Sequence, residues 1–86
     1  MTQLQHKIAI VTGAGGGFGE GIAQAYVKEG ARVVVADING TAAQRVASSL
    51  GAHASAFTCD VSQASQVQDL VAHCVSQFGV PDIVVN

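Results

Sequence analysis

Glycines gather in one short segment between a strand-like and a helix-like stretch. Residues 12–19 (TGAGGGFG) follow the apolar run 8–11, and a helical pattern opens at about Phe18. A diphosphate carries much charge and little shape, so binding it requires bare backbone N–H groups at the positive end of a helix, and glycines that allow close approach. The segment supplies both and predicts a dinucleotide-binding turn. A glycine-rich connector between a strand and a helix is the alternative, because the pattern alone is weak evidence.

One carboxylate follows the second apolar run. Asp37 lies 18 positions after Gly19, close to the offset of about 20 residues at which an acidic side chain meets the adenosine ribose. It could accept hydrogen bonds from both ribose hydroxyls and would repel a 2′-phosphate. No Arg or Lys stands in the glycine turn or directly after Asp37 to pair with such a phosphate, so NAD(H) is the predicted cofactor. The alternative is a polar turn residue that caps the next helix.

Strand-like and helix-like runs alternate along the chain. Strands are expected at 8–11, 32–36, 54–58 and 81–85, with the third at a sheet edge and the fourth buried. Helices are expected at about 18–29 and 41–50, and from Ser62 as N-cap to Phe78. The predicted inward faces comprise Phe18, Ile22, Ala25 and Tyr26 in the first helix, Ala43, Val46, Ala47 and Leu50 in the second, and Val67, Leu70, Val71, Cys74, Val75 and Phe78 in the third.

This order of elements predicts an α/β fold, a Rossmann-type doubly wound parallel sheet. The βαβαβαβ succession leaves connections long enough for helical crossovers, and the expected strand order is 3-2-1-4. The glycine turn then lies at the carboxyl ends of the strands, beside the switch point, where ligands of such sheets bind.

Composition limits the size and the partners of the fold. The 86 residues allow at most one small domain. Of these residues 49% are hydrophobic and 12% charged, against about 25% charged in an average soluble domain. We therefore expect the remainder of a larger domain, or a second subunit, to cover much of the surface. A net charge of −2 without a basic cluster argues against nucleic acid or an anionic membrane as partner.

Cysteine and histidine residues give no sign of a metal site. Cys59 and Cys74 lack the spacing of a zinc site or a disulfide framework and are expected to be buried small hydrophobes. His6, His53 and His73 are expected at N-terminal, loop and helix-surface positions, without a chemical role. With no secretory leader and no apolar run of about 18–20 residues, a cytoplasmic location and no membrane partner are predicted.

The glycine spacing Thr-Gly-x-x-x-Gly-x-Gly resembles the cofactor motif of the short-chain dehydrogenase/reductase family. Three further places agree with it: Asp37 matches the acidic residue of the NAD-preferring branch, residues 59–61 (CDV) resemble the segment that contacts adenine, and residues 83–86 (IVVN) resemble the start of the fourth strand and the Asn-Asn-Ala-Gly segment. The likeness covers essentially the whole chain. It is to the N-terminal half of the family, which includes 3-oxoacyl-[acyl-carrier-protein] reductases and sugar or polyol dehydrogenases.

The resemblance implies a cofactor role for ten residues. The glycines would shape the turn, Phe18 would offer its N–H to the diphosphate, Asp60 would bond the adenine amino group, Val61 would touch the adenine ring, and Asn86 would lie against the adenosine ribose. Asp60 as an N-cap near Ser62 is an alternative that can coexist. The complete set is Gly13, Gly16, Gly17, Phe18, Gly19, Asp37, Ile38, Asp60, Val61 and Asn86.

No catalytic residue is assigned within this chain. In the family that it resembles, a Tyr with a Lys four positions later, a Ser and an Asn assist hydride transfer, but Tyr26 is followed four positions later by Gly30 and is expected in the core. Arg45 and Asp69 are expected to be solvated surface charges. Residues 1–86 are thus predicted to be the N-terminal part of a single NAD-binding Rossmann domain.

The whole protein is expected to be an NAD(H)-dependent enzyme that interconverts a secondary alcohol and a ketone. The resemblance implies a small-molecule substrate and a homo-oligomer, either a dimer or a tetramer. A non-catalytic NAD-binding module, either a truncated product or a redox sensor, is the competing hypothesis. A methyltransferase with an S-adenosyl cofactor on a similar sheet is a third.

Overall fold

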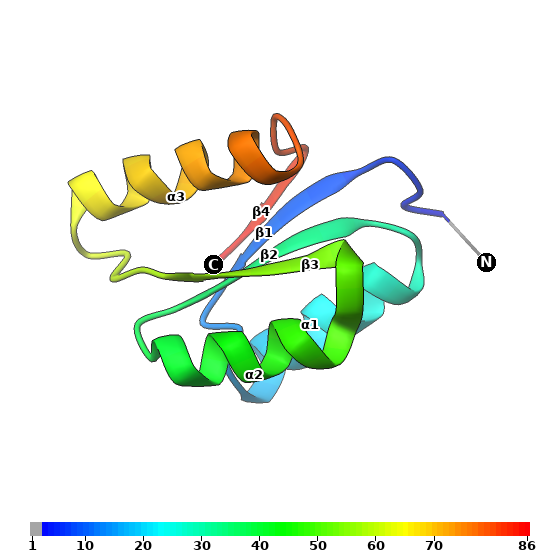
Figure 1. The fold of residues 1–86 in the computed structure, drawn as a ribbon, viewed down its shortest axis with the longest axis horizontal. Helices are drawn as coiled ribbons and strands as arrows, with labels where there is room; N and C mark the ends of the chain where they lie inside the picture. Colours follow the sequence, from blue (N-terminus) through cyan, green and yellow to red (C-terminus); the bar gives the residue numbers. More distant parts are fainter. Residues whose placement is uncertain (1–2) are drawn as a thin grey trace.

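Runs of apolar and β-branched residues form the strands of one parallel sheet. The computed structural model describes residues 3–86. Its strands are β1 (Ile8–Thr12), β2 (Arg32–Asp37), β3 (Ala54–Thr58) and β4 (Ile83–Val85). They lie in the order β3-β2-β1-β4 and all neighbours pair in parallel (Figure 1). The predicted strand order and Rossmann-type sheet are confirmed, with β3 at an edge.

Helices cover both faces of this sheet. The helices are α1 (Gly17–Lys28), α2 (Gly40–Leu50) and α3 (Ala64–Gln77), and the short 3-10 turn η1 (Gly51–His53) leads from α2 into β3. α1 and α2 lie on one face, and α3 lies on the other (Figure 1). The doubly wound arrangement is therefore confirmed.

Alternating side chains of the strands build a separate core on each face. Successive residues of a strand point to opposite sides, so Val33 and Val35 pack toward α1 and α2 while Val34 packs toward α3. All three valines are fully buried. The central residues of β2 are therefore apolar without interruption, as expected of a strand covered on both sides.

The predicted buried face of α1 differs in part from the structure. Ile22 and Tyr26 pack against the core as predicted, but Phe18 is 94% exposed and Ala25 is also exposed, and Ala23 is buried instead. Phe18 stands in the first turn, where the helix begins. Tyr26 is a core residue, as expected.

The fourth strand is less buried than predicted. Val84 is 58% exposed, and Ile83 and Val85 are partly buried on the α1 side. The α3 core gathers residues of β1 and β2 without Val84, so this face of β4 has no cover from α3. Val71 and Val75 on α3 are exposed for the same reason, although Leu70 and Cys74 are buried as predicted.

His73 lies against β3 rather than on an open helix surface. Its Nε2 is hydrogen-bonded to Ser55 Oγ at 2.8 Å, and its ring lies 4.8 Å from the Phe57 ring, centroid to centroid. Burial lowers the pKa of His73 below its ordinary value. The two cysteines are free and buried as expected, and burial raises the pKa of each thiol.

The lowered pKa of His73 predicts a pH dependence of stability. The unfolded chain takes up a proton as the pH falls through about 6.5, whereas the folded chain resists it, so stability is full above this pH and falls below it. Denaturant midpoints of the complete protein between about pH 5 and 8 should show this loss. His73→Gln should flatten the curve, and His53→Gln, at an exposed position, should not. Identical curves for His73→Gln and the unmodified protein would contradict the assignment.

Exposed apolar side chains predict how the isolated chain behaves. Val84 and the outer valines of α3 leave an apolar area beside a strand edge, and such surfaces promote association. Residues 1–86 expressed alone should self-associate or remain loosely packed, which light scattering coupled to size exclusion would detect. A monomer with a sharp cooperative melt would be the opposite result.

Candidate functional site

The glycine turn connects β1 to α1 with very little space inside it. Gly13 and Gly17 have φ angles of +64° and +58°, a region that residues with a side chain rarely adopt. Gly19 lies so close to the Gly13 carbonyl that an added Cβ would collide with its oxygen, and would stand 2.8 Å from Ala14 Cα. The Ala14 N–H donates to the Ala36 carbonyl at 3.0 Å, which ties the turn to the end of β2.

The start of α1 leaves backbone donors free for a ligand. Gly16 precedes the helix in an extended conformation and has no side chain that could cap it. The N–H groups of a first helical turn have no acceptor within the helix, which here concerns Gly17, Phe18 and Gly19. Free donors and the positive end of a helix dipole are features that suit an anion.

The Asp37 carboxylate is oriented by two backbone N–H groups. Its Oδ2 accepts from Gly15 N–H and its Oδ1 from Asn39 N–H, both at 2.9 Å. Asn39, and not Asp37, is the N-cap of α2, because Asn39 Oδ1 accepts from Ala42 N–H at 3.0 Å. Each carboxylate oxygen keeps a further lone pair, so Asp37 can accept hydrogen bonds from a ligand without a change of rotamer.

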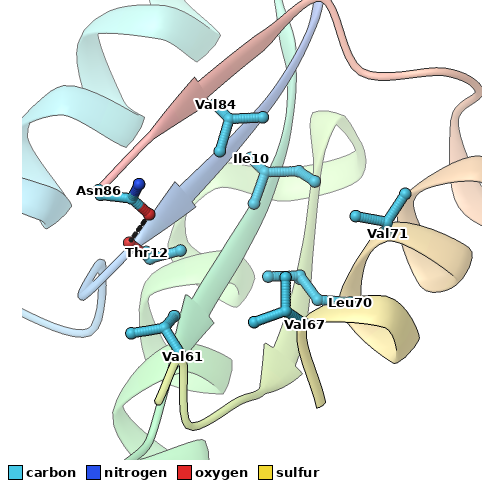
Figure 2. A pocket seen from close by; sticks show the side chains of 8 residues that line it. All are labelled: Ile10, Thr12, Val61, Val67, Leu70, Val71, Val84 and Asn86. Carbon is cyan, nitrogen blue, oxygen red and sulfur yellow. Dashed lines mark hydrogen bonds between the residues drawn. The ribbon is translucent and has the colours of Figure 1, made fainter. Parts of the chain in front are cut away.

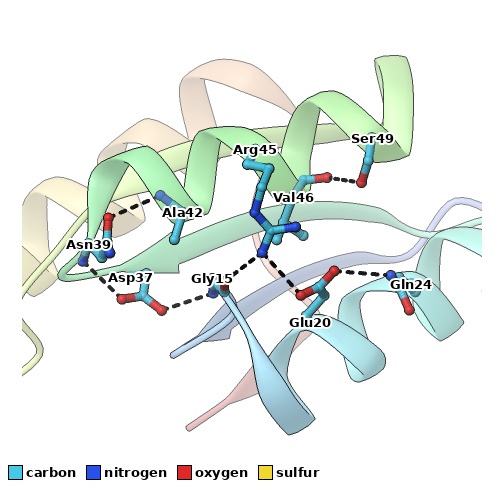
Figure 3. A network of polar contacts seen from close by, with 9 residues as sticks. All are labelled: Gly15, Glu20, Gln24, Asp37, Asn39, Ala42, Arg45, Val46 and Ser49. Carbon is cyan, nitrogen blue, oxygen red and sulfur yellow. Dashed lines mark hydrogen bonds and ion pairs between the residues drawn. The ribbon is translucent and has the colours of Figure 1, made fainter.

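Arg45 extends this arrangement to the other side of the glycine turn. Its Nη2 donates to the Gly15 carbonyl at 3.1 Å and lies 3.3 Å from Glu20 Oε1 (Figure 3). Arg45 is an exposed charge, as expected, but its ionic partner is Glu20 and not Asp69. The sequence has no Arg or Lys in the turn or directly after Asp37, yet α2 brings Arg45 against Gly15.

Asp60 is fixed by the turn that follows β3. Its Oδ1 accepts from the Ser62 hydroxyl at 2.7 Å and from the Ser62 N–H at 3.0 Å. These two hydrogen bonds lower the pKa of the Asp60 carboxyl, so it is ionised at neutral pH. The Asp60 N–H donates to Gln66 Oε1 at 2.8 Å, so α3 also supports this turn.

The predicted N-cap of α3 is wrong. Gln63 occupies the N-cap position, and no side chain caps it. Ser62 is engaged with Asp60 instead, because a short polar side chain competes for nearby groups in a turn. Asp60 is accordingly a turn-forming residue, not the cap of the helix.

Most of the predicted site residues meet around one depression at the carboxyl ends of the strands. Its volume is about 380 Å³. Thr12 and Cys59, which were not among the predicted residues, also line it. The lining predicted residues are Gly13, Asp37, Ile38, Asp60, Val61 and Asn86. The other four, Gly16, Gly17, Phe18 and Gly19, form the adjoining start of α1.

A second groove of about 340 Å³, lined mainly by aliphatic side chains, adjoins this depression. Figure 2 shows Val67, Leu70 and Val71 of α3 on one side, and Ile10 and Val84 of the sheet on the other. Both hollows share Thr12, Val61 and Asn86. The Thr12 hydroxyl lies 3.1 Å from the Val85 carbonyl oxygen and 3.2 Å from Asn86 Oδ1, which joins the ends of β1 and β4.

Within residues 3–86, two kinds of feature are absent. No group of three or more His, Cys, Asp and Glu side chains is placed to hold a metal ion. In the same part of the chain, no helix has the length and apolar character needed to cross a bilayer.

Comparison with known proteins identifies the family. Residues 7–86 match the family model described as short chain dehydrogenase. The chain belongs to the short-chain dehydrogenase family. This membership confirms the predicted resemblance and argues against the methyltransferase alternative.

Individual short-chain dehydrogenases are similar over nearly the whole chain. Sorbitol dehydrogenase of Cereibacter sphaeroides is 42% identical, over 98% of this chain and 33% of its own length. D-threitol dehydrogenase of Mycolicibacterium smegmatis is 41% identical, over 98% of this chain and 34% of its own. The crystal structure of 3-ketoacyl-(acyl-carrier-protein) reductase from Brucella melitensis, complexed with NADH, superposes with a TM-score of 0.94 at 43% identity, over 95% of this chain and 34% of the other. The chain thus spans about a third of the length of these relatives.

The tight turn of this short-chain dehydrogenase predicts unequal effects of two glycine substitutions. Gly19→Ala would push a methyl group into the backbone of Gly13 and Ala14, whereas a Cβ at Gly16 meets no atom within 4 Å. Gly19→Ala should lower the free energy of unfolding by about 1–3 kcal/mol, the usual range for overpacking. Gly16→Ala should change it little. Denaturant unfolding of the complete protein compares them, and equal stability of both variants would refute this packing.

Proposed function

We propose that the protein carrying this chain is an NAD(H)-dependent oxidoreductase that interconverts a secondary alcohol and a ketone. Residues 1–86 would form the N-terminal part of its single Rossmann domain. The observation that carries the proposal is the oriented Asp37 carboxylate beside an uncapped helix start. A ribose and a diphosphate, joined as in a dinucleotide, require these two features side by side.

The described residues suggest a place for each part of NAD. The diphosphate would meet the N–H groups of Gly17 to Gly19, with Gly13 and Gly16 giving it room to approach. The adenosine ribose would bond to Asp37 and lie against Asn86. Ile38 and Val61, which are 69% and 54% exposed, would flank the adenine, and Asp60 would accept from its amino group.

The preference for NAD over NADP rests on charge. The Asp37 carboxylate, which Gly15 and Asn39 orient, would repel a 2′-phosphate on a ribose bound beside it. The Brucella melitensis reductase, which is complexed with NADH in its crystal structure, supports the same choice.

The bound nicotinamide would accept or donate the hydride, which is the chemistry that this cofactor supplies. The chain's own part is to hold the adenosine half. We place the catalytic Tyr and its partner Lys, the Ser and the Asn outside residues 1–86. The sorbitol and D-threitol dehydrogenases favour a small alcohol or its ketone as substrate.

Assembly and location follow from other features. An exposed apolar face on β4 and α3 would be covered by further segments of the protein or by another copy of it. This supports a homo-oligomer, either a dimer or a tetramer. Two free, buried cysteines are in keeping with the reducing cytoplasm, where we place the protein.

A non-catalytic NAD-binding module is the second candidate. The chain supplies the features for binding a dinucleotide but only one tyrosine, which lies in the core. The deciding experiment adds NAD and a panel of polyols to the complete protein and follows the absorbance of reduced nicotinamide. Turnover supports the oxidoreductase, binding without turnover supports the module, and lack of NAD binding refutes both.

Asp37→Ala should weaken NAD binding by about 1–3 kcal/mol, the range for hydrogen bonds to a charged group. The preference for NAD over NADP should shrink as well, because the repelling charge is removed. Calorimetric titration of both nucleotides measures the two effects. Asp69→Ala, which removes a carboxylate at an exposed position on α3, is the matched control and should leave binding unchanged. An unaltered cofactor preference in Asp37→Ala would rule out the assigned role.

A further inference from the structure

The glycine turn contains a segment with no side chain of its own to hold it. Gly15, Gly16 and Gly17 follow one another, and glycine loses more conformational freedom on ordering than any other residue. The donors at the start of α1 are useful to an anion only when this segment is fixed. Contacts from elsewhere in the fold must therefore hold it.

Gly15 is the place where such contacts converge. It is buried, and an added Cβ would stand 2.8 Å from both Ala42 Cβ and Asp37 Oδ2. Its N–H donates to Asp37 at 2.9 Å and its carbonyl accepts from Arg45 at 3.1 Å (Figure 3). Both polar groups of Gly15 are thus bonded to charged side chains, from the end of β2 and from α2.

Arg45 is itself held by α1. Its Nη2 makes both contacts, to the Gly15 carbonyl and to Glu20 Oε1, and Glu20 Oε2 in turn accepts from Gln24 at 3.3 Å (Figure 3). The Arg45 side chain is 60% exposed, so its ion pair with Glu20 contributes little in water. The charge-assisted bond to the carbonyl is the contact that bears on the turn.

We propose that Arg45 is a positioning residue for the dinucleotide. It does not line the depression where the ribose and adenine would lie. By fixing the Gly15 carbonyl, it keeps the Gly15 N–H on Asp37 and the following amides aimed outward. This proposal rests on the proposed function, since it assigns Arg45 to the same nucleotide site.

The first test compares two arginine variants of the complete protein. Arg45→Met keeps most of the side-chain length and removes the donors, and Arg32→Met makes the same change at an exposed position at the start of β2. The dissociation constant for NAD should rise about three- to tenfold in Arg45→Met, the equivalent of one lost hydrogen bond. It should not change in Arg32→Met.

Two further variants separate the carbonyl bond from the ion pair. Arg45→Lys keeps one charged donor and should recover much of the affinity lost in Arg45→Met. Glu20→Gln removes the ion pair but leaves Arg45 free to donate to Gly15, so it should bind NAD nearly as the unmodified protein does. A loss in Glu20→Gln as large as that in Arg45→Met would overturn the role of the carbonyl bond.

Hydrogen exchange gives a readout that does not depend on NAD. The amides of Ala14 and Gly15, which donate to the Ala36 carbonyl and to Asp37, should exchange faster in Arg45→Met without nucleotide, while those of β3 remain as slow as before. If Arg45→Met fails to fold, Arg45→Gln, whose shorter side chain withdraws from Gly15, takes its place. A folded variant with unchanged NAD affinity and unchanged exchange overturns the proposal. Failure of the unmodified protein to bind NAD refutes the proposed function instead, and the exchange data still test whether Arg45 fixes the glycine turn.

Discussion

The parallel register of the sheet is the constraint on which the site depends. Thr12 pairs with Ala36, so the glycine turn after β1 and Asp37 at the end of β2 emerge side by side. Asp37 pairs in turn with Thr58, which brings the Cys59–Val61 segment next to it. Val11 pairs with Val85 and sets Asn86 beside Thr12. Four segments that are far apart in sequence therefore lie at the same end of the sheet, because parallel strands place all their carboxyl ends together.

The same register explains why much of the fold could be predicted from the sequence. Unbroken β-branched runs such as 33–35 fit only strands that are covered on both faces. Residues that end each strand were therefore the natural candidates for a ligand site, and the depression gathers six of the ten predicted residues: Gly13, Asp37, Ile38, Asp60, Val61 and Asn86. Periodicity and strand ends are local signals, and the sequence displays them directly.

Features that depend on contacts between elements were not predicted. Ser62 looked like a helix cap, but Asp60 draws it into a turn. Arg45 lies 30 positions from Gly15, and no local pattern links an exposed helical arginine to a backbone carbonyl in a distant turn. The apolar run at the end of the sequence predicts that Val84 is buried, yet α3 does not cover it. In each case the deciding partner lies on another element.

The crowding around Gly15 also limits how this turn can change in evolution. A side chain at position 16 has open space, whereas one at position 15 would collide with Ala42 and with the carboxylate of Asp37. The fold therefore accommodates a side chain at 16 alone, but one at 15 only together with a smaller residue at 42 and a different or displaced one at 37. We therefore expect substitutions at positions 15, 37 and 42 to be coupled, so that a lineage that replaces Gly15 also changes its neighbours at 37 and 42.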